Sequence, residues 1–298
     1  MTTDHKEPVS STAGKSNTGV AAHAQPLSAP LHLVQGNTPA DGGNLFLDPD
    51  EYDRLVSAYP AAEAFCKRFV GSAELLNSTY RRCLFLGAET KAQWEQIPPL
   101  MQHVAACKSY REQAPKTSAA YKLREQPWAF QEPVTLAPAL VIPRMISAHR
   151  TYVPMAFVDD NTVVGDSAFL LPHASHYHFG IISSHLHLCW LHATASKLKN
   201  DYRYLRDLTY NTFIWPQATP EQQAAITTLA EDILLKRKFY LTQTLAELYA
   251  PETMPKDLKQ AHEALDLAVE QLYRPEPFAD DAERTRFLVQ LYANAKAD

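Results

Sequence analysis

The stretch Ser196-Lys-Leu-Lys-Asn-Asp-Tyr-Arg-Tyr-Leu205, followed by Tyr210-Asn-Thr-Phe-Ile-Trp-Pro216, divides the sequence into two parts of different texture. It places cations, aromatic rings and an amide side chain close together. A nucleic-acid surface uses that mixture, because Lys and Arg neutralise phosphates while Arg and Asn can hydrogen-bond base edges. The alternative is the end of an amphipathic helix, with aromatic rings in the core and solvated charges. Composition alone leaves both interpretations open.

Upstream of this stretch, short apolar runs alternate with helical patterns. Helices are expected from Asp48, where Asp48 can cap and Pro49 follows, from Ala61 to Phe69 and from Ile97 to Glu112. Further β-like runs are bounded by charge, Pro, Asp, Asn or Gly: Arg82 to Leu86, Leu140 to Ile142, Tyr152 to Val153, Met155 to Val158, Thr162 to Val164 and Ala168 to Leu171. Helix resumes near Gly180 and continues past Trp190. The pattern predicts an α+β domain over residues 30–216.

Downstream of Pro216 the pattern is helical. Thr219 can cap a helix that begins with Pro220, and Asp257 to Tyr273 and Ala282 to Tyr292 repeat the helical spacing. After Pro216 there are nine Lys and Arg against fourteen Asp and Glu, so the acidic excess of the chain lies here. We therefore expect an all-α bundle over residues 217–298 that packs on the preceding domain.

The whole chain has 298 residues and a formal net charge of −5, which argues against a uniformly basic coat. Its four cysteines form no Cys-x-x-Cys pair, so neither a disulfide framework nor a zinc ribbon is indicated. Residues 1–29 are rich in small and polar residues and are expected to be a disordered leader, not a signal peptide. No run approaches the length of a membrane-spanning helix. These features predict a soluble, cytoplasmic protein.

Several motifs occur together in this sequence: Asn37-Thr-Pro-Ala-Asp-Gly-Gly-Asn-Leu45, Pro143-Arg-Met-Ile-Ser-Ala-His-Arg-Thr-Tyr-Val-Pro154, Tyr177-His-Phe-Gly-Ile-Ile-Ser-Ser184 and the stretch quoted first. With them the chain resembles, from about Leu31 to its end, the C-terminal part of the MmeI-like (type IIL) restriction-modification enzymes and their adenine-specific DNA methyltransferase relatives. The sequence departs from the family at Ile214, where Pro is expected, and at Ser196, where Gly is expected.

The resemblance implies a mixed α/β target recognition domain followed by a helical C-terminal domain, with double-stranded DNA as partner. An adenine methyltransferase also needs an Asn/Asp-Pro-Pro-Tyr/Phe loop to hold the flipped base, and this chain has none. We therefore expect no catalytic, cofactor or metal site here. The resemblance implies that S-adenosylmethionine and Mg²⁺ belong to the full-length enzyme, and a separately encoded methyltransferase subunit is one candidate partner.

Three groups of residues are candidates for DNA contact. The most basic window of the chain would neutralise phosphates: Lys108, Arg111, Lys122 and Arg124. A polar stretch between apolar runs could project into a groove: Arg144, His149, Arg150 and Tyr152. The third group lies in and around the stretch quoted first: His192, Lys197, Lys199, Tyr202, Arg203 and Asn211. The alternatives are a solvated helix for the first group and, for Arg144, a structural arginine buried against a carboxylate.

Two other classes of function compete with DNA recognition. The chain could be an inactive remnant or a protein-interaction module whose helical bundle docks on a methyltransferase subunit. Six histidines crowd one segment and could support a metal-dependent hydrolase: His173, His176, His178, His185, His187 and His192. No Cys or Glu at a recognisable spacing accompanies them, so the metal hypothesis is the weakest of the three.

Overall fold

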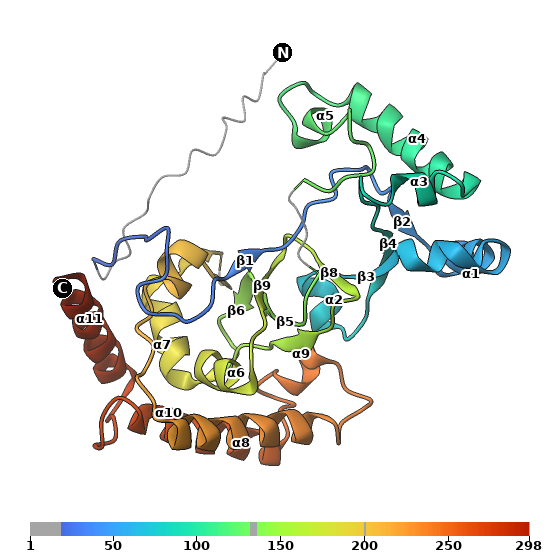
Figure 1. Cartoon of the computed structure of the whole chain (residues 1–298). Helices are drawn as coiled ribbons and strands as arrows, with labels where there is room; N and C mark the ends of the chain where they lie inside the picture. The colour runs from blue at the N-terminus through green and yellow to red at the C-terminus, as the bar shows by residue number, and fades with distance from the viewer. Residues whose placement is uncertain (1–18, 132–135, 200, 298) are drawn as a thin grey trace.

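The computed structural model describes residues 19–131, 136–199 and 201–297 and confirms the expected α+β fold class. In these described residues, helices surround three sheets (Figure 1). Helices α8 (Pro220–Arg237) and α10 (Lys256–Gln271) run side by side along the lower edge of the molecule, and α11 (Asp281–Ala297) lies at its left end (Figure 1). Among the described residues, no helix combines the length and the apolar character that crossing a membrane requires.

The first lobe is built on the sheet β2-β4-β3-β8, which joins Phe46–Leu47, Arg81–Leu84, Cys66–Val70 and Thr162–Val164. Its helices are α1 (Pro49–Ala58), α2 (Ser72–Leu76), α3 (Lys91–Trp94), α4 (Pro98–Gln113) and α5 (Ala119–Lys122). Asp48 caps α1 as expected, because its carboxylate accepts a 2.7 Å hydrogen bond from the Glu51 amide. Trp94 and Leu100 are buried in the core under these helices.

The central sheet β1-β9-β5-β7 joins Val34–Gln35, Ala168–Pro172, Ala139–Pro143 and Ala156–Val158. β5 pairs antiparallel with β9 over its whole length, from Ala139 opposite Pro172 to Pro143 opposite Ala168. Every residue of β5 is buried, which explains why its sequence is continuously apolar. The third sheet begins where the chain leaves β5. In it, β11 (Asp201–Arg203) lies between β10 (Ser196–Leu198) and β6 (Met145–Ser147).

The C-terminal helices share a core with the preceding domain. They are α8 (Pro220–Arg237), α9 (Leu245–Leu248), α10 (Lys256–Gln271) and α11 (Asp281–Ala297). Helices α8, α10 and α11 pack on α6 (His176–Ser183) and α7 (His185–Thr194), whereas α9 contacts α2. Thr219 and Gln222 form the capping box that starts α8. Gly180 lets α6 approach α8 closely, because a Cβ atom there would lie 2.7 Å from a methyl carbon of Ile226.

Some expected elements are corrected by the structure. The helix expected over Ala61 to Phe69 is a 3₁₀ turn, Pro60–Phe65, followed by strand β3, because Cys66 to Val70 pair with β4 and β8. The helix expected past Gly180 is two helices. Ser184 separates them and its hydroxyl caps α7 by accepting from the His187 amide. Tyr152 and Val153 are buried but form no strand.

The disordered leader is corrected in part. Residues 1–18 lie outside the described residues. Residues 19–29 pack against the domain: Val20 is fully buried, and the amides of His23 and Leu27 donate to the carbonyls of Asp207 and Asn211 at 2.7 and 2.8 Å. This segment therefore belongs to the fold.

Candidate nucleic-acid interface

The three-stranded sheet brings together two of the predicted groups of DNA-contact residues. Arg203 in β11 lies opposite Met145 in β6 and opposite Ser196 in β10, while Tyr202 lies opposite Ile146 and Lys197. Arg144 immediately precedes β6. The backbone thus places the stretch after residue 196 against the stretch after Pro143, although about fifty residues separate them in the sequence.

Arg144 and Arg203 lie near each other on this sheet. Arg203 is exposed, and Arg144 is half-buried with its Nη1 donating to the Asp166 carbonyl at 2.8 Å. Burial lowers the pKa of Arg144, and the positive charge of Arg203 lowers it further, while Asp166 acts in the opposite direction. Two guanidinium groups held this close attract an anion more strongly than either would alone.

The β10–β11 hairpin adds two lysines and a stack of rings. Lys197 and Lys199 are exposed, and Lys199 has a positive φ of 56° at the hairpin turn. The Tyr202 ring stacks on the His192 ring with centroids 4.3 Å apart, and Lys197 Nζ lies 5.1 Å from the Tyr202 centroid. Burial lowers the pKa of His192, with neighbouring His185 as a further cause. The stack joins strand β11 to helix α7 (His185–Thr194).

We call Arg144, Lys197, Lys199 and Arg203 the hairpin cations. Within residues 19–131, 136–199 and 201–297, no ion pair joins any of them to a carboxylate. Asp207, a partner one could expect for Arg203, instead pairs with Arg206 at 2.7 Å. These cations can therefore attract an external anion, Lys197 from the face of the sheet that carries Tyr202 and Arg203 from the opposite face.

Arg111 is not a DNA contact, which corrects the prediction. Its side chain is fully buried between the segment after α4 and the loop before β2. Its guanidinium donates to five backbone carbonyls at 2.7 to 3.3 Å: Pro39, Ala40, Leu123, Gln126 and Ala129. A buried arginine satisfied in this way stabilises the lobe and cannot reach a phosphate.

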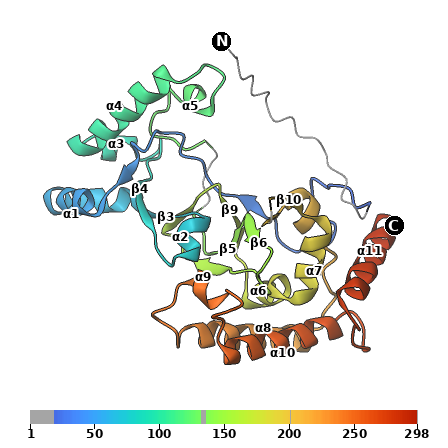
Figure 2. The same ribbon diagram turned by 180° about the vertical axis from the view of Figure 1, so that it is seen from behind.

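The other cations of the α4–α5 window are on the surface. Lys108 forms an ion pair with Glu112 at 3.8 Å, and Arg124 forms one with Glu125 at 3.3 Å. Lys122 is exposed. The window lies in the first lobe, away from β6 and β10 (Figure 2). Contact of these three residues with DNA stays a prediction.

Two further predicted residues are structural. Tyr152 is buried, stacks on His262 at 4.1 Å and donates its hydroxyl proton to Asp266 at 2.7 Å. Asn211 is buried, and its amide donates to the His23 carbonyl at 2.7 Å. Both hold neighbouring segments in place and do not face solvent, so the prediction of base contact is wrong for them.

Arg150 and His149 differ in their surroundings. Arg150 is half-buried, its Nη1 donates to the Ala246 carbonyl in α9 at 2.9 Å, and burial lowers its pKa. It therefore links the turn after β6 to helix α9. His149 is exposed in the turn after β6. Of these two residues, only His149 has a side chain open to a ligand.

The six histidines of the crowded segment do not converge on one point. His178 bonds Ser175 within the first turn of α6, and His176 pairs with Glu231 at 2.8 Å. His187 is fully buried with its Nε2 2.9 Å from the Tyr204 hydroxyl, and burial lowers its pKa to about 3. Only His185 belongs to a group of metal-ligand type among the described residues.

Asp166 and Thr38, which were not predicted from the sequence, lie beside Arg144. Thr38 donates its hydroxyl to the Asp166 carboxylate at 3.1 Å, and the Asp166 carbonyl holds Arg144. The two loops touch because both contain glycine: a Cβ atom on Gly36 would lie 2.1 Å from the Gly165 carbonyl oxygen. Two glycines that each precede a polar loop residue are the signal that could have indicated this contact.

Comparison with known proteins defines the class to which this fold and site belong. Residues 14–217 match the family described as the MmeI target recognition domain, and residues 218–298 match the MmeI C-terminal domain. The chain therefore belongs to the MmeI target recognition domain family and carries its C-terminal domain as well. This confirms the resemblance found in the sequence motifs.

Two particular relatives are similar over nearly the whole chain. DNA methyltransferase A of Bacillus subtilis (strain 168) is 36% identical over 277 residues, which are 92% of this chain and 31% of that protein. The structure of the type IIL restriction-modification enzyme MmeI in complex with DNA is similar with a TM-score of 0.87 and 30% identity, covering 94% of this chain and 37% of that one. The chain thus spans about a third of the length of these relatives.

Proposed function

We propose that this chain is the sequence-specific DNA recognition module of a type II restriction-modification or adenine-N6 DNA methyltransferase system. The observation that carries the proposal is that the hairpin cations, which lie in or next to the strands of the three-stranded sheet, have no carboxylate partner among the described residues. The family and the solved relative in complex with DNA support it. No comparable observation favours the remnant or the hydrolase.

The geometry suggests a division of work among the hairpin cations. Lys197 and Lys199 stand on the exposed hairpin, where flexible ammonium groups can follow a phosphate backbone. Arg144 and Arg203 have planar guanidinium groups, which can make paired hydrogen bonds to guanine O6 and N7 in the major groove. Arg144 is already oriented by the Asp166 carbonyl, so little side-chain freedom is lost when it binds.

We further propose that methyl transfer belongs to another part of the system, either elsewhere in a longer polypeptide or in a separately encoded methyltransferase subunit. The proposal is supported by the missing Asn/Asp-Pro-Pro-Tyr/Phe loop and by the share of the relatives that this chain spans. S-adenosylmethionine and Mg²⁺ would bind there. Isothermal titration of the purified chain with S-adenosylmethionine should show no binding, and measurable binding would contradict this assignment.

The salt dependence of DNA binding tests the recognition proposal. The affinity of the chain for duplex DNA should fall steeply as salt rises, because each neutralised phosphate releases counterions. Changing Arg144, Lys197, Lys199 and Arg203 together to alanine should reduce the slope of log affinity against log salt by about 0.9 for each phosphate that the variant no longer neutralises. Circular dichroism melting checks that the variant is folded.

A matched control carries the same kind of change in the other basic region. Lys108, Lys122 and Arg124 are changed together to alanine, which removes three surface cations of the α4–α5 window. The slope should change much less in this variant than in the hairpin variant. An unchanged slope in the folded hairpin variant, or no DNA binding by the wild-type chain at low salt, would show the proposal to be wrong.

A further inference from the structure

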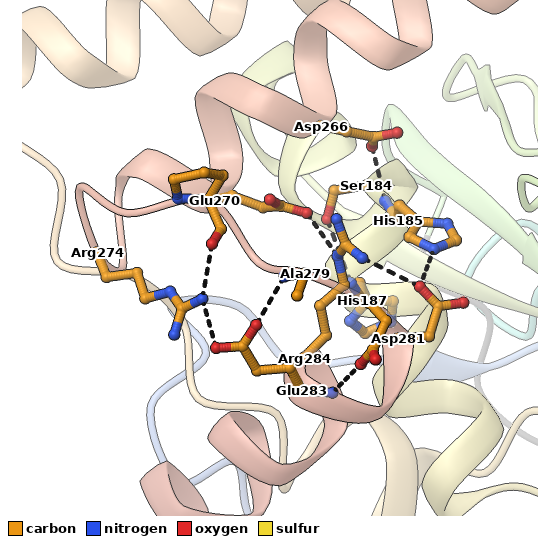
Figure 3. Close-up of polar contacts among 12 residues, drawn as sticks. Ser184, His185, His187, Asp266, Glu270, Arg274, Ala279, Asp281, Glu283 and Arg284 are labelled. Carbon is orange, nitrogen blue, oxygen red and sulfur yellow. Dashed lines mark hydrogen bonds and ion pairs between the residues drawn. The ribbon is translucent and has the colours of Figure 1, made fainter.

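Three side chains with different ligand atoms meet where the C-terminal helix α11 packs against α7. His185 and Cys189 are four residues apart on α7, which places them on the same face of the helix. Asp281 is the first residue of α11. A nitrogen of His185, the sulfur of Cys189 and a carboxylate oxygen of Asp281 all lie within 4.8 Å of one another. Figure 3 shows the His185 ring and the Asp281 carboxylate facing each other.

The donor atoms of this group are those that Zn²⁺ takes in proteins, namely imidazole nitrogen, thiolate sulfur and carboxylate oxygen. His185 Nε2 and Asp281 Oδ1 are 2.8 Å apart in a hydrogen bond, so both atoms can reach one ion once the His185 proton has moved from Nε2 to Nδ1. Cys189 is buried, whereas the Asp281 side chain is 63% exposed. An ion can therefore reach the group from solvent past Asp281 and bind the buried sulfur of Cys189.

The charges around the group favour a cation. Arg284 bonds Glu270 through Nε at 2.7 Å and Asp281 through Nη1 at 3.2 Å, so one guanidinium serves two carboxylates (Figure 3). A third carboxylate, Asp266, accepts from the His185 amide at 2.7 Å, and this bond fixes the start of α7. The three carboxylates Asp266, Glu270 and Asp281 thus lie near a single guanidinium, that of Arg284, so the fixed charges of these groups favour a cation.

We propose that His185, Cys189 and Asp281 bind one Zn²⁺ ion, which fastens helix α11 to helix α7. The thiol proton of Cys189 leaves to solvent, and the thiolate binds the metal. His185 binds through Nε2 as the neutral tautomer with its proton on Nδ1, and the Asp281 carboxylate supplies one oxygen. A water molecule completes the tetrahedral set. Arg284 keeps its bond to Glu270.

A bound dication would change the protonation state of the Cys189 thiol. Burial raises the pKa of this thiol to about 12, and the negative charge of Asp281 raises it as well. The thiol is therefore uncharged at neutral pH in the absence of metal. A bound dication reverses that preference, because a coordinating thiol is deprotonated outright.

Cobalt titration of the chain tests the proposal. The whole chain is treated with a chelator, kept reduced and titrated with Co²⁺ and then with Zn²⁺. We expect thiolate-to-cobalt charge-transfer absorption that saturates at one equivalent and disappears as Zn²⁺ displaces cobalt. Zn²⁺ should also raise the melting temperature, because it binds only the folded form. Saturation without charge-transfer absorption, or no metal binding, overturns the proposal.

Three variants separate this site from other metal binding. Cys189→Ser should abolish the charge-transfer absorption, although Cys66, Cys83 and Cys107 remain. Asp281→Asn alters an exposed side chain and should weaken Zn²⁺ binding at least about 10-fold, since even groups that only orient a metal ligand have effects of that size. His176→Gln is the matched control, because His176 pairs with Glu231 at the same 2.8 Å distance but has no thiol beside it. Equal Zn²⁺ affinity in Asp281→Asn and wild type overturns the proposal even where Cys189→Ser fails to fold.

Discussion

The α4–α5 window and the β10–β11 hairpin look alike in sequence, since both interleave Lys and Arg with Tyr. In the structure they differ in how their charges are used. Arg111 donates hydrogen bonds to five backbone carbonyls, and Lys108 and Arg124 form ion pairs with glutamates. The hairpin cations have no ion-pair partner within the described ranges.

The contrast teaches that a local count of cations does not measure the charge available to a ligand. What decides is whether the fold supplies an acceptor for each charged side chain. A cation with a carboxylate beside it gains less from a phosphate, because the existing pair must first be broken or screened. A cation that the fold leaves unpaired keeps its full attraction for an external anion.

The largest expected effect separates the two regions by stability. Arg111→Ala leaves five carbonyl groups in the interior without their donor, so we expect the free energy of unfolding to fall by about 3 to 5 kcal/mol. Urea denaturation measures this loss. The DNA affinity of the fraction that remains folded should be unchanged. A loss of DNA affinity without a loss of stability would return Arg111 to the interface and break the comparison.

A smaller effect is expected for the hairpin, this time on binding. Arg203→Ala should lower DNA affinity by about 1 to 3 kcal/mol, because it removes a contact to a base or a phosphate, while the melting temperature stays nearly constant. Arg206→Ala is the matched control, since Arg206 lies three residues away, is exposed and is paired with Asp207. Fluorescence anisotropy with one duplex measures both variants. Equal losses for the two arginines would contradict the role given to unpaired charge.

Local signals made part of this structure predictable. Asp48 with Pro49 and Thr219 with Pro220 announce helix starts, because a cap and a first-turn proline act within a few residues. The helical prediction is wrong for the run from Cys66 to Phe69, because its strand partners lie in β4 and, much later in the chain, in β8. Pairing with distant strands determines the secondary structure of this segment, and its short sequence pattern does not predict that pairing.

The candidate site was predictable in its residue types but not in its assembly. Arg144 and Arg203 come from stretches that only the register of β6 against β11 brings together. Conversely, Arg111 and Asn211 have the residue types of DNA contacts, yet burial assigns both to the framework. Burial depends on the packing of distant segments, such as residues 19–29 against Asn211, and a linear pattern does not contain it.

Acid should reduce the stability contributed by the His187–Tyr204 contact next to the hairpin, but not the stability contributed by Arg111 in the window. His187 bonds Tyr204, which directly follows β11, and burial lowers its pKa in the folded state to about 3. Between pH 6.5 and about pH 3 the unfolded chain therefore binds more protons at this site, so stability falls as pH falls. The window relies on Arg111, which stays charged throughout.

The slope of stability against pH measures this effect. A single buried histidine contributes up to about 1.4 kcal/mol per pH unit in this range. His187→Gln keeps an acceptor for the Tyr204 hydroxyl and should reduce the slope by about that amount. His262, whose pKa burial also lowers, accounts for part of the slope that remains. An identical slope in the variant and the wild type would show that His187 does not control the acid sensitivity.

The smallest effect is expected at Lys108, and it decides whether the comparison holds at the surface. Lys108 and Glu112 are both more than half exposed and 3.8 Å apart on α4, so Lys108→Ala should change the free energy of unfolding by no more than about 0.5 kcal/mol. Its DNA affinity should also stay within about 0.5 kcal/mol of wild type, since Glu112 already offsets the charge that a phosphate would need. Glu112→Gln provides the complementary change, because it releases Lys108 from its partner without removing it. If Lys108→Ala lowers DNA affinity as much as Arg203→Ala does, the window contacts DNA directly. An ion pair in the free protein would then not predict which cations stay out of the DNA interface.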